Sequence, residues 1–198
     1  MVTSDAHPGL EQRVAAVPPR EWQTARLAAA AATRADADAV LESYARDPEV
    51  ARYMVWRPHR DVGETLAFLE TCEAAWASGK SYSWCLRLKP DGPLVGMLSA
   101  RVRGESMDMG YVLGRRWWRR GLMSEAVTWL VQWAWEQPTI ARVWATCDVD
   151  NAASAGLLER IGMRREGTLR RWVPRPSLGG GPRDSLTYSL LRNGHRPK

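Results

Sequence analysis

The stretch YVLGRRWWRRGLMSEA, residues 111–126, constrains the fold of this chain more than any other segment. We expect a strand over residues 108–113, an interruption at Gly114 and a helix from about Leu122. A strand that turns directly into a helix aims free backbone N–H groups and the positive end of the helix dipole at one point. Such a point is an anion site, and polyphosphates are its commonest ligands.

The residues of this turn also suit a polyphosphate. Gly121 stands where a side chain would hinder close approach of a ligand to the backbone. The turn contains neither a Walker A loop nor a GxGxxG fingerprint, because GKS and GKT are missing and the glycine spacing differs. Four arginines surround it: Arg115, Arg116, Arg119 and Arg120.

The turn resembles the acetyl-CoA pyrophosphate loop of the GNAT superfamily of N-acetyltransferases. The family pattern, Arg/Gln-x-x-Gly-x-Gly/Ala, falls on residues 118–123 and keeps Gly121 as its central glycine. Trp118 replaces the leading residue, as is usual in the branch that contains the ribosomal-protein N-terminal acetyltransferases. Two residues depart from the pattern: Arg119 replaces a glycine of that branch, and Met123 replaces a small residue. The resemblance implies that the phosphates of acetyl-CoA dock at the backbone amides of the turn, near Arg119, Arg120, Gly121, Leu122, Met123 and Ser124.

A second segment, DVDNAASAGLLERIGMRREG, resembles the cofactor-side helix and following strand of the same family. Taken singly, Asn151 is explained as a helix N-cap and Gly162 as a C-terminal stop. The order and spacing of the two segments favour the family interpretation, which makes Asn151 a cofactor-binding residue. The residues in register with the family are Asn151, Ser154, Leu158, Gly162, Met163, Glu166 and Gly167.

The resemblance implies acetyl transfer from acetyl-CoA to an amine, with the pantetheine arm running along Val112 and Leu113 as an added strand. Family members often protonate the leaving thiolate with a tyrosine, but the corresponding residue here is Leu158. A glutamate base used in part of the ribosomal-protein branch would align near Val173. Ser154 matches the serine associated with catalysis in that branch; the alternative is a polar residue in the first turn of a helix.

The general base and the acceptor pocket are less sharply defined. Asp108 is the candidate base, and the alternative is a structural carboxylate bonded to backbone or arginine. His59 titrates near neutrality and follows Trp56 in the loop Trp56-Arg57-Pro58-His59. The acceptor pocket is expected to contain Trp56, His59 and Tyr111, and the loops 53–62 and 174–183 are expected to shape it.

Composition limits the chain to one domain. Its 198 residues suffice for one packed core, which we assign to residues 24–192, after a flexible lead over 1–23 and before a tail over 193–198. Apolar runs are too short to span a bilayer, and the N-terminus is too polar for a secretory signal. The three cysteines are widely spaced and form no metal or disulfide pattern. A reducing, cytoplasmic location is therefore expected.

The formal charge of +6 makes nucleic acid a rival partner. The arginines are dispersed except around 115–120 and 164–175, and the first cluster has an anionic partner in CoA. The leading hypothesis is an N-acetyltransferase that acts on a protein N-terminal amine or a small amine. The alternative is a non-catalytic protein of the same fold that binds acyl-CoA or RNA. A homodimer is the default expectation for such an enzyme.

The expected elements give a mixed, mostly antiparallel α/β sheet with helices on both faces. The resemblance further implies that two neighbouring strands splay apart to admit the pantetheine arm. Helices are expected over 36–45, 61–79, 121–136 and 151–161. Strands are expected over 81–89, 94–102, 107–113, 141–147, 163–173 and 184–191. A first strand over 25–33 is implied by the resemblance, whereas alanine propensity alone would favour a helix there.

Overall fold

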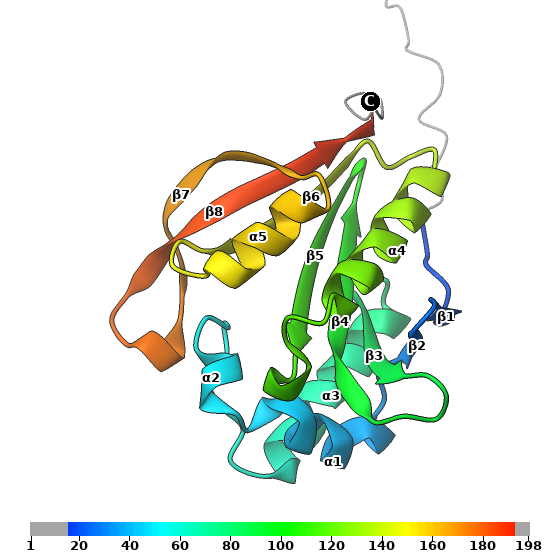
Figure 1. Ribbon diagram of the computed structural model, residues 1–198, viewed down its shortest axis with the longest axis vertical. Coiled ribbons are helices and arrows are strands. Elements are labelled where there is room, and N and C mark those ends of the chain that lie inside the picture. The colour runs from blue at the N-terminus through cyan, green and yellow to red at the C-terminus, as the bar shows by residue number, and fades with distance from the viewer. Residues whose placement is uncertain (1–15, 193–198) are drawn as a thin grey trace, which may run out of the picture.

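The computed structural model describes residues 16–192, which form one eight-stranded sheet covered by helices on both faces (Figure 1). The strand order is β1-β2-β3-β4-β5-β6-β8-β7, and all neighbours are antiparallel except β5 and β6. The expected mixed α/β fold is thereby confirmed. The strands are β1 (Glu21–Gln23), β2 (Leu27–Ala31), β3 (Tyr82–Leu88), β4 (Leu94–Arg103), β5 (Ser106–Leu113), β6 (Arg142–Asp148), β7 (Arg164–Pro174) and β8 (Pro182–Leu191).

The helices form two layers. One face of the sheet packs against α4 (Leu122–Glu136) and α5 (Ala152–Arg160), and the other against α1 (Ala37–Val40) and α3 (Val62–Ala77), with α2 (Pro48–Ala51) beside them. The helix expected over 36–45 is irregular: a 3₁₀ turn precedes α1 and a π-helical turn follows it. The short turns are η1 (Arg34–Asp36), η2 (Leu41–Ala45), η3 (Arg115–Trp117) and η4 (Pro176–Leu178).

The core beneath α4 extends further toward the N-terminus than the sequence indicated. Leu122, Ala126 and Leu130 recur at helical spacing and are buried against the sheet. Trp22 of β1 is 6% exposed, and its ring stacks on Trp129 at 4.0 Å. Residues 21–23 of the predicted lead over 1–23 form β1, whose single buried tryptophan gives no periodic signal in the sequence, whereas residues 1–15 of the lead and the predicted tail over 193–198 lie outside the described residues.

The ends of α3 and α5 are set by residue types that typically cap helices. The Asp61 side chain accepts a hydrogen bond of 3.1 Å from the Glu64 amide at the start of α3. The Glu64 carboxylate accepts from the Arg60 amide at 2.9 Å, one residue before the amide that it would bind in a capping box. Gly162 follows α5 with φ of 90°, a conformation that glycine adopts without strain.

The parallel pair β5 and β6 is joined over a short length only. The parallel ladder runs from Ser106 to Asp108 on β5 and from Arg142 to Trp144 on β6. Beyond it the two strands diverge in the middle of the sheet (Figure 1). The remaining residues of β6 continue to pair with β8. This divergence, expected from the resemblance, creates the space in which the candidate site lies.

Candidate active site

Two clefts meet where β5 and β6 diverge. The first, about 680 Å³, lies between α2, the end of β5, the turn before α4 and the first part of α5. The second, about 630 Å³, lies between α3, the middle strands and the end of β7. Because they share part of their walls, a molecule in one cleft can reach a molecule in the other. The shared residues are Tyr53, Met54, Tyr111, Val112, Asn151 and Ser154.

The turn before α4 has the conformation that an anion cradle needs. Gly121 is the N-cap of α4 and has φ of 74°, which an L-residue adopts only at a cost. Arg26, the residue before β2, holds this turn: its Nη1 donates to the Arg120 carbonyl at 2.9 Å, and its Nε donates to Glu125 Oε2 at 2.7 Å. The free amides of the first turn of α4 thus face a defined position.

Eight of the nine predicted cofactor-binding residues line the first cleft; these are Val112, Leu113, Arg119, Gly121, Leu122, Met123, Ser124 and Asn151. Arg120 is the exception among the described residues. Its guanidinium lies 5.0 Å from the centre of the Trp117 ring, and its carbonyl is bound by Arg26. Cation–π stacking directs the Arg120 side chain toward Trp117, and the predicted role of its backbone amide in phosphate binding stays a prediction.

Tyr111 and Ser154 form the shared wall of the two clefts. Tyr111 Oη lies 2.7 Å from Ser154 Oγ, so β5 and α5 are hydrogen-bonded across the gap between β5 and β6. Asn151 fixes the start of α5 by accepting from the Ser154 amide at 3.1 Å. Burial raises the pKa of the Tyr111 phenol, so the hydroxyl keeps its proton at neutral pH. Two hydroxyl groups are therefore available at the junction.

The second cleft brings together the three residues predicted for the acceptor pocket, namely Trp56, His59 and Tyr111. His59 Nδ1 lies 2.9 Å from Thr65 Oγ1, and the His59 ring lies 5.5 Å from that of Trp56. Burial lowers the pKa of His59 despite the opposing charges of Glu64 and Asp61, so its imidazole is neutral at pH 7.

Asp108 lies outside both clefts. It belongs to the part of β5 that still pairs with β6, before the two strands diverge. Its carboxylate is buried and accepts from Arg101 Nε at 2.7 Å. This geometry is the structural alternative that the sequence left open, and we therefore do not assign the base to Asp108.

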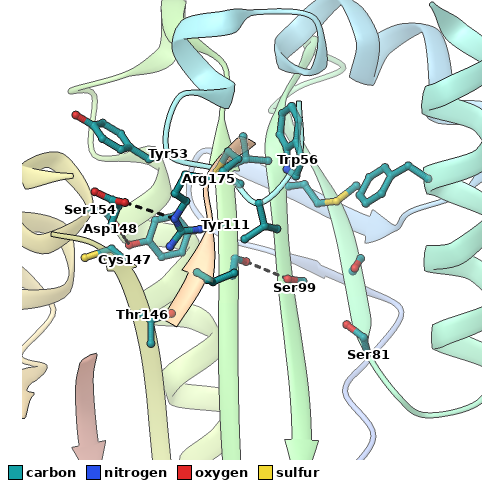
Figure 2. Close-up of a pocket in the computed structure, with 18 of the residues that line it drawn as sticks. Tyr53, Trp56, Ser81, Ser99, Tyr111, Thr146, Cys147, Asp148, Ser154 and Arg175 are labelled. Carbon is teal, nitrogen blue, oxygen red and sulfur yellow. Dashed lines mark hydrogen bonds and ion pairs between the residues drawn. The ribbon is translucent and has the colours of Figure 1, made fainter. Parts of the chain in front are cut away.

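Three charged residues of the second cleft were not predicted from the sequence: Arg101, which binds Asp108, and the pair Asp148 and Arg175. Asp148 ends β6 and is fully buried, and Arg175 follows β7 with 6% of its surface exposed. Arg175 falls in the loop that was expected to shape the acceptor pocket, but nothing in its sequence context distinguishes it from other arginines. Figure 2 shows both side chains beside Tyr111 and Ser154.

The other expected features concern cysteines, metals and membranes. All three cysteines are free and buried, and burial raises the pKa of the Cys147 thiol, which lines the second cleft. Across residues 16–192 there is no group of three or more His, Cys, Asp or Glu side chains that could hold a metal ion. Within the same range, every helix is too short or too polar to cross a membrane.

A family comparison decides what this arrangement is. Residues 26–164 match the model of the acetyltransferase (GNAT) domain. The chain belongs to the GNAT family of acetyltransferases. This GNAT protein is 25% identical to the uncharacterized N-acetyltransferase YoaA of Bacillus subtilis over 173 residues, which cover 86% of the chain and 96% of YoaA. As a member of the family, it is an acetyltransferase whose cosubstrate is acetyl-CoA.

Solved structures of GNAT enzymes share the fold. The microcin C7 self-immunity acetyltransferase MccE, solved with acetyl-CoA and AMP, matches with a TM-score of 0.79 and 19% identity over 88% of this GNAT chain and 98% of MccE. RimL, an acetyltransferase of ribosomal protein L7/L12 solved with CoA, matches with a TM-score of 0.75 and 18% identity over 85% and 95% of the two chains. Ribosomal-protein acetyltransferases are thus among its structural neighbours.

Proposed function

We propose that this enzyme transfers the acetyl group of acetyl-CoA to a primary amine by direct attack within a ternary complex. The observation that carries the proposal is the junction of two clefts at Tyr111 and Ser154. A cosubstrate in the first cleft and an amine in the second would meet there. Holding two reactants in contact contributes much of the acceleration of such a reaction.

The residues of the first cleft fit acetyl-CoA. The amides from Gly121 to Ser124 would hold the pyrophosphate, and the free edge of β5 at Val112 and Leu113 would pair with the pantetheine arm. Ala152, Ala153 and Gly156 of α5 form a wall of small side chains on the opposite side. When bound, acetyl-CoA supplies the acetyl group as an activated thioester.

The residues at the junction suit the proton transfers. As the amine nitrogen bonds to the acetyl carbon and the C–S bond breaks, one proton must leave the nitrogen and the sulfur must gain one. Ser154 donates to the leaving sulfur, and Tyr111 passes its proton to Ser154 and regains one from water in the cleft. Neutral His59 in the second cleft, which we call the acceptor cleft, takes up the amine proton through water and releases it to solvent, so that Tyr111 and His59 return to their starting protonation states.

The acceptor cleft supports a small amine on an apolar body. Its walls carry several aromatic side chains, which give large apolar contact area. A protein N-terminal amine remains the competing acceptor, since RimL acts on ribosomal protein L7/L12. The aromatic side chains that line this cleft are Tyr44, Tyr53, Trp56, Phe68, Tyr111 and Trp172.

Release of free CoA thiol from acetyl-CoA tests the proposal, measured with phenethylamine, tryptamine and N-terminal peptides as acceptors. We expect amine-dependent release with intersecting double-reciprocal plots, which indicate a ternary complex. Parallel plots would instead indicate an acetylated enzyme and contradict direct attack. Faster turnover of peptides than of every small amine would contradict the choice of a small acceptor.

A further inference from the structure

Arg175 differs from the other charged residues of the acceptor cleft. It is only 6% exposed, although it follows the exposed strand β7. Figure 2 shows its guanidinium pointing into the cleft beside Tyr111. Arg101, the other arginine of this cleft, is already bound by the buried carboxylate of Asp108. Arg175, whose nearest ion-pair distance is 3.7 Å, is therefore the less closely paired arginine of this cleft.

The donors of Arg175 are largely unpaired. Within residues 16–192, Arg175 Nε is buried and has no hydrogen-bond partner. Arg175 Nε forms a long ion pair of 3.7 Å with Asp148 Oδ2, and Arg175 Nη2 donates a long hydrogen bond of 3.5 Å to Ser185 Oγ. A guanidinium has five N–H donors, and leaving buried donors unpaired costs free energy. Such a group calls for a partner that is missing from the protein itself.

Asp148 is held more closely by Arg183 than by Arg175. Arg183 donates to the two Asp148 carboxylate oxygens at 2.8 and 3.0 Å and also pairs with Asp150 at 2.6 Å, and the Asp150 amide donates to Asp148 at 3.1 Å. These contacts hold the pKa of the Asp148 carboxyl below its usual range against the effect of burial. Arg175 is thus held by Asp148 only through a long ion pair of 3.7 Å, and its guanidinium keeps N–H donors that an anion in the cleft can use.

We propose that Arg175 binds a carboxylate or phosphate of the acceptor, so that the substrate is a primary amine with an anionic group on an apolar body. This inference rests on the proposed function. The planar fork of arginine matches the two oxygens of a carboxylate or phosphate. Arg175 and the Tyr111–Ser154 pair line the same cleft, so the anion anchors the acceptor while its amine faces the junction.

Matched amines that differ in the anionic group test the proposal. The pairs are L-phenylalanine and phenethylamine, L-tryptophan and tryptamine, and phosphoethanolamine and ethanolamine. We expect the anionic member of a pair to have the higher kcat/KM. Arg175→Gln should lower that value roughly 10- to 100-fold, as for loss of a hydrogen bond to a charged group, and leave the uncharged member within about 3-fold. Faster turnover of the uncharged amines would overturn the proposal.

Two control variants separate recognition from structure. Arg175→Lys keeps the charge and should retain part of the preference. Arg183→Gln removes the arginine that donates twice to Asp148 but does not line the cleft. If Arg175 only stabilised Asp148, Arg183→Gln would have at least the same effect, and both variants would slow anionic and uncharged amines equally. That result would overturn the proposal.

A binding experiment keeps the inference separate from the proposed function. The probes are 3-phenylpropionate and its uncharged amide, titrated by tryptophan fluorescence into protein saturated with CoA. We expect the carboxylate to bind at least about 10-fold more tightly and to lose this advantage in Arg175→Gln. Equal binding of both probes would overturn the inference even if amines are acetylated. Selective carboxylate binding without amine turnover would support it and count against the proposed function.

Discussion

Tyr111 Oη lies 2.7 Å from Ser154 Oγ, and this hydrogen bond spans the gap between β5 and α5 where the two clefts meet. Tyr111 reaches this position because β5 has already separated from β6. Ser154 reaches it because Asn151 caps α5 and fixes its first turn. Two residues far apart in sequence thus form one proton-donating unit, which supports the proposed protonation of the leaving sulfur.

Removal of either hydroxyl should slow the chemical step rather than weaken binding. We expect Ser154→Ala to lower kcat about 100-fold, within the range for loss of a general acid, with KM for acetyl-CoA within about 3-fold. Tyr111→Phe should lower kcat less, and the double variant should resemble Ser154→Ala because the two residues act as a unit. Steady-state kinetics on one amine measures all three.

Ser99→Ala is the control for this pair. Ser99 lines the acceptor cleft and donates to the Gly110 carbonyl at 3.2 Å, but it lies outside the shared wall. Its loss should change kcat by less than about 3-fold, as for one neutral hydrogen bond. A loss of kcat as large as that of Ser154→Ala would remove the special role assigned to the junction.

Acetyl-CoA binding should depend on the backbone of the α4 turn. Gly121→Glu places a carboxylate where the pyrophosphate would lie and strains a residue with φ of 74°. We expect the Kd for acetyl-CoA, measured by calorimetry, to rise by roughly 30-fold or more. Gly104→Glu adds the same charge at φ of 58° in the β4–β5 turn, away from both clefts, and should bind normally. Equal weakening in both variants would argue against a phosphate cradle at Gly121.

Arg26 is expected to act as a positioning residue for that turn. It joins the Arg120 carbonyl to Glu125 without lining either cleft. Arg26→Gln should raise KM for acetyl-CoA about 3- to 10-fold while kcat changes little, because loss of two such hydrogen bonds loosens the turn. The control variant is Arg60→Gln, which removes another exposed ion pair, the one between Arg60 and Glu64. If both variants leave KM unchanged, the turn is held without Arg26.

Glu166 should make folding stability depend on pH below neutrality. Hydrogen bonds from Arg142, and then from Ser189, lower the pKa of Glu166 to about 2. A carboxyl with a lowered pKa in the folded state stabilises it fully above its ordinary pKa, and this contribution is lost as the pH falls toward 2. Glu166→Gln should therefore be less stable at pH 7, with a Tm lower by about 2–4 °C, and should lose less stability on acidification.

Thermal unfolding between pH 7 and pH 2 measures this difference. Glu70→Gln is the matched variant, since Glu70 forms an exposed ion pair with Arg34 at 3.5 Å. Exposed pairs contribute little, so its unfolding should follow the unmodified protein. Parallel pH profiles for Glu166→Gln and the unmodified protein would show that Glu166 has no lowered pKa.

The positions of most helices and strands could be predicted because the signals for them lie close together in the sequence. The capping side chains of Asp61 and Asn151, the glycine at 121 and the apolar spacing of α4 each act within a few residues. With such signals, the strands and helices after residue 60 were predicted to within a few residues of their observed bounds. The segment 27–31 is alanine-rich, and helix propensity alone would have made it helical; only the family resemblance indicated β2.

The sequence by itself determined the order of elements, the turn at Gly121 and the family, because these depend on spacing along the chain. Tertiary structure decided which charged groups face the clefts. Arg101 neutralises Asp108, Arg120 stacks on Trp117, and Arg175 points into the acceptor cleft. The partners of a side chain come from strands and helices distant in sequence, and burial changes the strength of each charge. Arginines that are alike in sequence therefore have different roles in the folded protein.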